Sequence, residues 1–426
     1  MRGREESRRT RRRFLAETSG ALALPYFVPA SVLGFQPGSG ANDRPVVGIV
    51  GCGVRCWSMI GFLREMPDGP RIAAISDVCQ NRMAETLAQH QAGWNCYQDY
   101  RHMLEAERLD GVLVCVPEHW HVLVSVHALQ AGVDVYNEKP FSLTIAEGRY
   151  LVDAVKRYNR VLQTGTQARS FPVNEYACRL VREGLVGKVH TVLSRACNGP
   201  RPMAALPKQQ APAGFNWDLW TGQAPLHEFN FNYCQDRTTW RSRWIGWRDY
   251  AGGMATNMAS HAVDLIVMAL GMDLTGPTEI WPTSDEGPES FMRIRYAEGI
   301  EVRFEERDRH PVWGGVFIGD QGKIEINRKK VVTNPPDLIR EKLPAEGEVA
   351  DHIRNWLECI KTRQQPRAHA ETGHRVCSTC HLLNISRQLR RKLQWDPQAE
   401  RFVGDDEANA LLDRPRRRGY ELPSLA

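Results

Sequence analysis

The chain has 426 residues, 42% of them hydrophobic and 25% charged, which is an ordinary composition for a globular protein with room for two domains. Residues 1–40 hold seven Arg and three Glu, so most of the formal net charge of +5 lies at one end. The rest of the chain is nearly neutral, which argues against a nucleic-acid-binding surface.

The N-terminus is typical of a twin-arginine export signal. Seven Arg lie within the first 13 residues, and the segment 10–15 (Thr-Arg-Arg-Arg-Phe-Leu) fits the twin-arginine pattern. Residues 18–42 are uncharged, but Pro25 and Pro29 interrupt them, so we expect no stable membrane span. We predict a signal and linker over 1–40, a partner in the twin-arginine export machinery, and a periplasmic location. A disordered basic tail is the alternative.

A dinucleotide-binding motif follows this segment. The β-branched run 46–50 leads into Gly51-Cys-Gly53 and then into a helical stretch, which is the setting that the dinucleotide fingerprint requires. Gly51 permits a tight turn, and Gly53 lets the backbone approach a pyrophosphate. Val54 and Arg55 would begin the helix whose N-terminus binds the phosphates.

Asp77 is predicted to select the cofactor. It ends a second apolar strand, 71–76, and lies 24 residues after the second glycine of the turn. A carboxylate there accepts hydrogen bonds from both ribose hydroxyls and repels a 2′-phosphate, so NAD is favoured over NADP. The alternative is that Asp77 only opens a loop.

Strands and helices continue to alternate through residue 166, which predicts a parallel, doubly wound sheet over 41–166. Polar segments follow three of the expected strands, at 117–121, 137–140 and 165–167. Ligands bind beyond the carboxyl ends of such strands, so we expect these segments to lie around one site.

At this point the sequence resembles the Gfo/Idh/MocA oxidoreductases. The resemblance covers about residues 44–420 and depends on five features in order: the turn at Gly51, Asp77, the loop from Pro117 to His121, Glu138-Lys139-Pro140, and Gly-Gly-x(7)-His-x-x-Asp at 252–264. It implies the fold class α/β followed by α+β: a Rossmann doubly wound parallel sheet, then an α/β domain over 167–426 with an open, mostly antiparallel sheet. An exposed face on that sheet would favour a homo-oligomer.

The resemblance also implies the cofactor contacts. We expect NAD to be held by Gly51, Gly53, Val54, Arg55, Asp77, Val116, Pro117, His121, Glu138, Lys139 and Gln167.

Lys139, Asn257 and His261 are the expected catalytic residues. The resemblance assigns Lys139 to the nicotinamide ribose and the substrate, and His261 to acid–base catalysis. Asn257 stands where the family carries Asp, so it has no charge to raise the basicity of His261. A helix beginning near residue 256 would place Asn257, His261 and Asp264 on one face. The alternative is that His261 is a core histidine.

A tryptophan-rich segment favours a carbohydrate substrate. Trp217, Trp220, Trp240, Trp244 and Trp247 are interleaved with Arg and Asn, and aromatic faces with polar donors bind sugars well. We expect Trp244, together with Arg169 and Asp264, to contact the substrate. The alternative is that these tryptophans belong to the core or to subunit contacts.

Cys377-Ser-Thr-Cys-His381 matches the attachment pattern of c-type haem, yet it lies inside an expected helix. His374, Cys377 and His381 share one face of that helix, but two turns of one helix cannot supply four tetrahedral ligands. We therefore predict neither haem nor metal.

These features together predict an NAD(P)-dependent enzyme that oxidises a sugar, sugar derivative or polyol by hydride transfer. A protein exported folded would carry NAD with it into a compartment without a nicotinamide pool, so we expect tightly bound, internally recycled cofactor. Two alternatives stay open: glycoside cleavage or epimerisation through transient oxidation, and a non-catalytic NAD-bound sugar-binding protein.

Overall fold

The computed structural model describes residues 44–234, 243–305 and 310–425. The expected export signal and Trp240 lie outside the described residues. Residues 45–426 form one compact unit that contains two sheets. Within the described ranges, no helix is long and apolar enough to cross a membrane.

The first sheet is parallel throughout, with the strand order β3-β2-β1-β4-β5-β6, which confirms the predicted doubly wound sheet. Its strands are short and rich in β-branched residues, and β4 is buried along its whole length, as expected for a sheet covered on both faces. The strands are β1 (Val46–Val50), β2 (Arg71–Ser76), β3 (Asn95–Tyr97), β4 (Gly111–Val114), β5 (Asp134–Asn137) and β6 (Leu162–Thr164).

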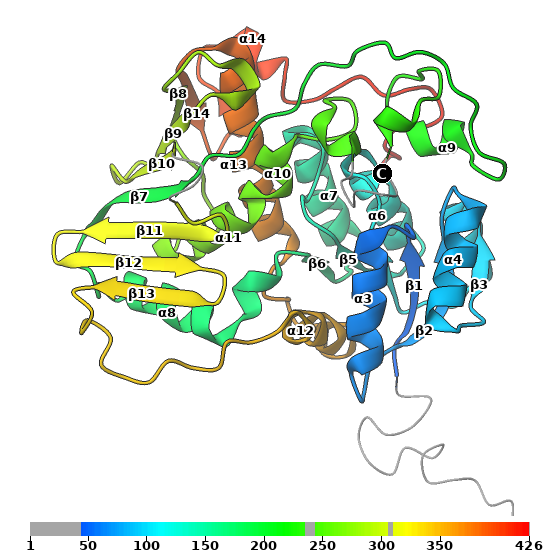
Figure 1. The fold of residues 1–426 in the computed structure, drawn as a ribbon, viewed down its shortest axis with the longest axis horizontal. Helices are drawn as coiled ribbons and strands as arrows, with labels where there is room; N and C mark the ends of the chain where they lie inside the picture. The colour runs from blue at the N-terminus through cyan, green and yellow to red at the C-terminus, as the bar shows by residue number, and fades with distance from the viewer. Residues whose placement is uncertain (1–43, 235–242, 306–309, 426) are drawn as a thin grey trace, which may run out of the picture. The chain divides into compact units, whose positions relative to one another are not determined.

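Helices and short turns alternate with these strands, and α12 returns from late in the chain to pack against α3 (Figure 1). The helix α7 begins at Ile145, because the Thr144 hydroxyl accepts the amide of Glu147 at 3.1 Å. These elements are α3 (Val54–Glu65), α4 (Gln80–His90), α5 (Tyr100–Ala106), η1 (Glu118–Trp120), α6 (His121–Gln130), α7 (Ile145–Tyr158), η2 (Gln167–Ser170) and α12 (Val349–Thr362).

The second sheet has nine strands in the order β13-β12-β11-β7-β10-β9-β8-β14-β15. Only the pair β7–β10 is parallel, which confirms the expected open, mostly antiparallel sheet. The strands are β7 (Val189–Arg195), β8 (Glu279–Pro282), β9 (Met292–Arg295), β10 (Glu301–Glu305), β11 (Gly314–Gly319), β12 (Gly322–Asn327), β13 (Lys330–Asn334), β14 (Leu393–Asp396) and β15 (Arg401–Phe402).

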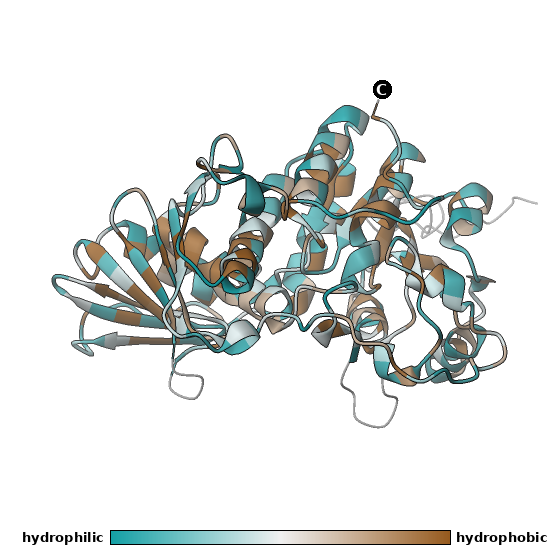
Figure 2. Ribbon diagram, turned by 90° about the horizontal axis from the view of Figure 1, so that it is seen from above, coloured by the Kyte–Doolittle hydropathy of each residue, from teal (hydrophilic) through white to brown (hydrophobic). Residues whose placement is uncertain are grey.

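One face of this sheet is apolar and covered by helices. In β10, Val302 and Phe304 are buried while the residues between them are half-exposed, and Figure 2 shows the same alternation of brown and teal along the strands. The helices α8 (Pro172–Arg182) and α11 (Ala259–Leu270) pack on the buried face. This packing places the N-terminus of α11 at the boundary between the two sheets.

The helix α13 (Ala370–Leu389) joins the two halves, since it packs against α7 of the first sheet and β8 of the second. Its cysteine and histidine side chains are buried in that contact. His381 Nε2 donates to the Ser142 carbonyl at 3.0 Å, Cys377 Sγ donates to the same carbonyl at 3.3 Å, and His374 Nε2 lies 2.8 Å from Glu400 Oε1. Across the described ranges, no group of three or more His, Cys, Asp or Glu side chains could hold a metal ion.

The remaining short elements lie on the connections around the site. They are α9 (Trp217–Thr221), η3 (Phe231–Tyr233), η4 (Arg243–Gly246), α10 (Met254–Asn257), η5 (Gly287–Glu289) and α14 (Asp406–Asn409).

Candidate active site

A cleft of about 360 Å³ lies at the carboxyl ends of β1, β2, β4 and β5. The structure gathers most of the predicted site residues there, from loops that are far apart in the sequence. Those that line the cleft are Gly51, Gly53, Val54, Arg55, Asp77, Val116, Pro117, His121, Glu138, Lys139, Trp244 and Asn257.

The glycine turn makes the floor of the cleft. Gly51 has φ +93°, and a Cβ there would lie 2.5 Å from the Cys115 carbonyl oxygen, so no other residue fits. The helix α3 begins directly after Gly53, which supplies no side-chain cap to the first amides. The free amides and the turn without side chains form a backbone surface of the kind that binds a pyrophosphate. The residues therefore fit a dinucleotide.

Asp77 holds the same turn from β2. Its carboxylate oxygens accept the amides of Cys52 at 2.7 Å and Cys79 at 2.8 Å. Burial raises the pKa of Asp77, against the opposing effects of Arg82 and the two amides. Both Asp77 and Arg82 line the cleft, so a carboxylate and a guanidinium lie together at its ribose end.

Glu138 anchors the other side of the cleft. Its Oε1 lies 2.7 Å from the Arg55 guanidinium, and it accepts the Gln167 amide at 3.1 Å. Gln167 also donates to the Tyr136 hydroxyl at 2.9 Å. Gln167 therefore supports Glu138 from behind rather than lining the cleft.

His121 ties two of the site loops together. Its Nδ1 lies 2.6 Å from the Pro140 carbonyl oxygen, and its Nε2 lies 3.0 Å from that of Val116. Burial lowers the pKa of His121, so the neutral ring donates to one carbonyl at a time.

Lys139 meets Asn257 at a break between two helices, which makes the prediction of one continuous helix wrong. The helix α10 ends at Asn257 and α11 begins at Ala259, because the amide of His261 bonds to the Met258 carbonyl at 3.1 Å. The Asn257 carbonyl is thus released from the helix. Lys139 Nζ donates to it at 2.8 Å and to Asn257 Oδ1 at 3.1 Å.

His261 lies at the start of α11, buried against Trp313 with ring centroids 4.2 Å apart. Its ring has no hydrogen-bond partner among the described residues, and its Nδ1 is buried. Burial lowers the pKa of His261 well below its ordinary value, and the nearby Lys139 and Arg55 lower it further. The imidazole is therefore neutral at pH 7, able to accept a proton but without a carboxylate to strengthen it.

Glu118 is a fully buried carboxylate that the sequence analysis did not single out. Its Oε2 accepts the Gly252 amide at 2.8 Å and the Thr256 hydroxyl at 2.9 Å, while Oε1 has no hydrogen-bond partner among the described residues. Burial raises the pKa of Glu118 to about 7, against the opposing effects of those two bonds and of Lys139. Its place in the polar segment 117–121 after β4 was the signal that could have identified it.

Glu118 and Lys139 act on one another electrostatically. Burial lowers the pKa of Lys139, whereas the negative charges of Glu138 and Glu118 raise it. A carboxylate does therefore reach the Lys139–Asn257 pair, but it comes from the loop after β4 and not from position 257.

Arg169 and Asp264 form one buried ion pair. Their nearest charged atoms are 2.8 Å apart, the side chains are 7% and 1% exposed, and Arg169 also pairs with Asp273 at 2.5 Å. The pair joins η2 to α11, next to His261 in the sequence. We therefore assign Arg169 and Asp264 to support of the site rather than to substrate contact.

The tryptophans belong to an aromatic cluster that also borders the cavities. Trp217 stacks on Trp220 with centroids 4.9 Å apart in this cluster, and Trp220 and Trp244 both line the cofactor cleft. A second cavity, of about 1420 Å³, begins at Asn257 and is lined by Trp247 among others. It meets the cofactor cleft at Ile245 and Asn257, which line both.

Two family models match the chain. Residues 46–166 match the oxidoreductase family described as an NAD-binding Rossmann fold, and residues 201–422 match its C-terminal alpha/beta domain. The chain belongs to the GFO/IDH/MocA oxidoreductase family. The cleft between the strand ends and α10 falls within the matched residues, as do both sheets except the strand β7.

Individual relatives match over part of their length. The chain is 28% identical over 156 residues to the myo-inositol 2-dehydrogenase of Thermotoga maritima, which is 37% of this chain and 46% of that protein. It is 29% identical over 204 residues to a glycosyl hydrolase family 109 protein of Parabacteroides distasonis, which is 42% of this chain and 43% of that protein. The chain thus spans about half the length of the curated relatives it matches.

Among solved structures, the WlbA dehydrogenase of Bordetella pertussis, in complex with NADH and UDP-GlcNAcA, shares the fold with a TM-score of 0.60. The two chains are 16% identical, over 83% of this chain and 99% of the other. At that identity the likeness establishes the GFO/IDH/MocA fold alone.

Proposed function

We propose that this GFO/IDH/MocA protein oxidises a sugar, sugar derivative or polyol by hydride transfer to NAD. The observation that carries the proposal is the contact of Lys139 with Asn257, next to a neutral His261, between the dinucleotide cleft and the second cavity.

The glycine turn and the first amides of α3 would hold the pyrophosphate, and Asp77 would bind the adenosine ribose. When bound, the nicotinamide ring accepts the hydride from a carbinol carbon. The carboxylate of Asp77 supports NAD as the cofactor, although Arg82 beside it would tolerate a 2′-phosphate.

The chain's own residues handle the hydroxyl group of the substrate. The Lys139 ammonium donates a hydrogen bond to the hydroxyl oxygen, where negative charge develops as the proton leaves. The neutral His261 accepts that proton. Asn257 orients the Lys139 ammonium, and ionised Glu118 stabilises the positive charge of that ammonium.

A screen of sugars, sugar acids and polyols, read by the absorbance of the reduced nicotinamide, tests the proposal. With an active substrate, Lys139→Met and His261→Ala should each slow hydride transfer by at least about a hundredfold, the usual scale for a lost acid–base group. Asn257→Asp should keep or raise the rate. The exposed Arg354 on α12 offers Arg354→Gln as a control that should change nothing. An active His261→Ala combined with an inactive Asn257→Asp would contradict these roles.

We also propose export and internal recycling of the cofactor, on the evidence of the arginine-rich N-terminus. A folded protein that carries NAD across the inner membrane would enter a compartment without free nicotinamide nucleotide, so its bound cofactor could not be exchanged. A second substrate or a later step must therefore take the hydride back. Protein purified from the periplasm should contain NAD and turn over without added cofactor. Empty protein that needs added NAD would oppose this part of the proposal.

Glycoside cleavage through transient oxidation is a second candidate, favoured by the similarity to the glycosyl hydrolase family 109 protein. A panel of chromogenic glycosides, with and without bound NAD, separates it from simple dehydrogenation.

A non-catalytic sugar-binding protein is the third candidate, favoured by Asn257 and by the weak base His261. Sugar binding without any change in nicotinamide absorbance would identify it.

We propose a homo-oligomer as well, through the uncovered face of the second sheet. That face carries paired charges, with Arg293 2.8 Å from Glu305 and Arg303 2.7 Å from Glu301. Light scattering after size-exclusion chromatography should give a mass above that of one chain, and charge-reversal of Glu301 should lower it.

A further inference from the structure

A third cavity, separate from the cofactor cleft, lies beside the C-terminal half of α13. It is a cavity of about 440 Å³ that shares no lining residue with the cleft. Its wall includes the loop 199–202, the C-terminal half of α13 and the segment 410–415. Asn384 of α13 donates to the Gly252 carbonyl at 2.7 Å, so this wall is directly bonded to the turn that precedes α10.

The charge inside this cavity is strongly positive. Four arginines line it, Arg248, Arg387, Arg390 and Arg414, and the one carboxylate among the described lining residues is Asp413. Asp413 is already engaged, since its oxygens pair with Arg416 at 2.8 Å and accept the Thr144 hydroxyl at 3.2 Å. Of the four arginines, Arg390 pairs with Asp285 at 3.5 Å.

Arg414 and Arg248 lie next to one another in this cavity. The Arg414 guanidinium donates to the Arg248 carbonyl, and neither side chain forms an ion pair with any residue of the described ranges. Burial lowers the pKa of Arg414 and the neighbouring Arg248 guanidinium lowers it further, whereas the negative charges of Glu147, Asp249 and Glu118 raise it. Two guanidinium groups that share a cavity repel one another, and an anion bound between them removes that repulsion.

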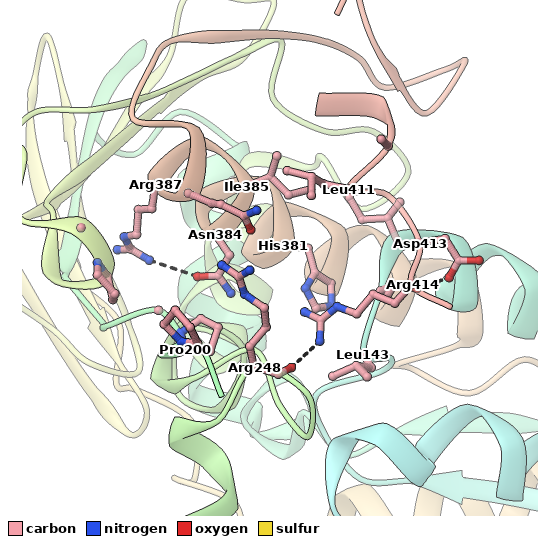
Figure 3. A pocket seen from close by; sticks show the side chains of 18 of the residues that line it. Leu143, Pro200, Arg248, His381, Asn384, Ile385, Arg387, Leu411, Asp413 and Arg414 are labelled. Atoms are coloured by element: carbon pink, nitrogen blue, oxygen red, sulfur yellow. Dashed lines mark hydrogen bonds between the residues drawn. The ribbon is translucent and has the colours of Figure 1, made fainter. Parts of the chain in front are cut away.

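His381 adds a different kind of group to the same wall. Its Nε2 faces the Ser142 carbonyl at 3.0 Å and so carries the proton, because a carbonyl can only accept. Burial lowers the pKa of His381 to about 4, so the ring is neutral at pH 7. Its Nδ1 is then an acceptor with no partner among the described residues, suited to a hydroxyl group. Figure 3 shows Arg248, Arg414, Asn384 and His381 close together in the cavity.

We propose that this cavity is a binding site for a small hydroxylated oxyanion, such as a sugar acid or a sugar phosphate. The two guanidinium groups of Arg414 and Arg248 bind the acidic group, and His381 Nδ1 accepts a hydroxyl. The volume suits a molecule of monosaccharide size, and the site adjoins the cavity at Asn257, with which it shares Gly199 and Pro288.

Titration calorimetry on the full chain tests the proposal, with NAD at saturation so that the pyrophosphate cradle is filled. The probes are D-gluconate for a carboxylate, D-glucose 6-phosphate for a phosphate ester, and D-glucose as the neutral counterpart. We expect one of the two anions to bind and glucose to be without effect at this site. Arg414→Gln and Arg248→Gln should each weaken that binding by at least about tenfold, as the loss of one charge-assisted contact implies. Arg354→Gln, an exposed arginine of α12 outside the cavity, should not.

Three results would overturn the proposal. The first is the absence of binding by both anions. The second is binding that Lys139→Met abolishes while Arg248→Gln leaves it unchanged, which would place the anion in the cavity at Asn257. The third is an oligomer that Arg248→Gln dissociates, which would show that an acidic side chain of a second copy fills the cavity. The Arg248 side chain makes no hydrogen bond or ion pair with the described residues, so Arg248→Gln decides the matter if Arg414→Gln fails to fold.

Discussion

Replacing Glu118 by Gln separates the electrostatic role of this buried carboxylate from its place in the packing. Gln has nearly the same shape and can still accept the bonds from Gly252 and Thr256, but it has no charge for Lys139. We expect the variant to be more stable than the parent at alkaline pH and slower in hydride transfer.

The magnitude follows from the pKa of Glu118, which burial raises to about 7 from an ordinary value of 4.5. Between these two values the unfolded chain has lost the proton and the folded chain keeps it. The free energy of unfolding therefore falls as pH rises through that window, by at most about 3 kcal/mol for this group. In a chain of this length, 3 kcal/mol corresponds to about 4 °C in melting temperature.

Calorimetric melting at about pH 5 and about pH 8 measures the effect. Relative to the parent, Glu118→Gln should gain stability at the higher pH and little at the lower, whereas Glu358→Gln, on an exposed face of α12, should follow the parent at both. The rate of hydride transfer by the parent should rise as pH passes about 7, when Glu118 ionises. The variant should show no such rise, and its rate at high pH should be about tenfold lower. An unchanged pH profile together with unchanged melting would refute the reasoning, because the carboxylate would then be neutral throughout.

Three other substitutions test the scaffold of the site. Gly51→Ala should abolish NAD binding in calorimetry and lower the free energy of unfolding by about 1–2 kcal/mol or more, because φ is +93° and the new Cβ meets a carbonyl oxygen. The control is Gly61→Ala in α3, where no atom lies within 4 Å of the added Cβ, and this variant should bind NAD normally. Asp77→Ser should raise the affinity for NADP relative to NAD, as measured by competition titration, and an unaltered ratio would mean that Asp77 only supports the turn. Arg169→Met should lower the free energy of unfolding by about 3–5 kcal/mol in denaturant melts, since it leaves Asp264 as a buried, unpaired charge. The double variant Arg169→Met with Asp264→Leu should recover part of that loss, and equal stability of all three proteins would show that the pair is solvated.

Local sequence was enough to predict the first domain and most of the cofactor cleft. Short β-branched strands that alternate with helices form a parallel sheet, and in a parallel sheet every strand ends at the same edge. The residues after β1, β2, β4 and β5 therefore had to meet, and the turn at Gly51, the carboxylate of Asp77 and Lys139 of the Glu-Lys-Pro segment all line one cleft. The same reasoning extends to α7, whose start depends only on the neighbouring Thr144.

Tertiary structure decided what lies around the reacting groups. Periodicity predicted a single helix through residues 256–264. The helix instead breaks at Met258, where the amide of His261 bonds to the Met258 carbonyl and Lys139, from a distant loop, takes the freed carbonyl of Asn257. Glu118 and Gly252 are 134 residues apart, and Arg414 and Arg248 are 166 apart. Groups brought together over such separations leave no local pattern in the sequence. Secondary-structure propensity and residue spacing act over a few residues, whereas burial and electrostatic interactions depend on which segments the fold packs side by side.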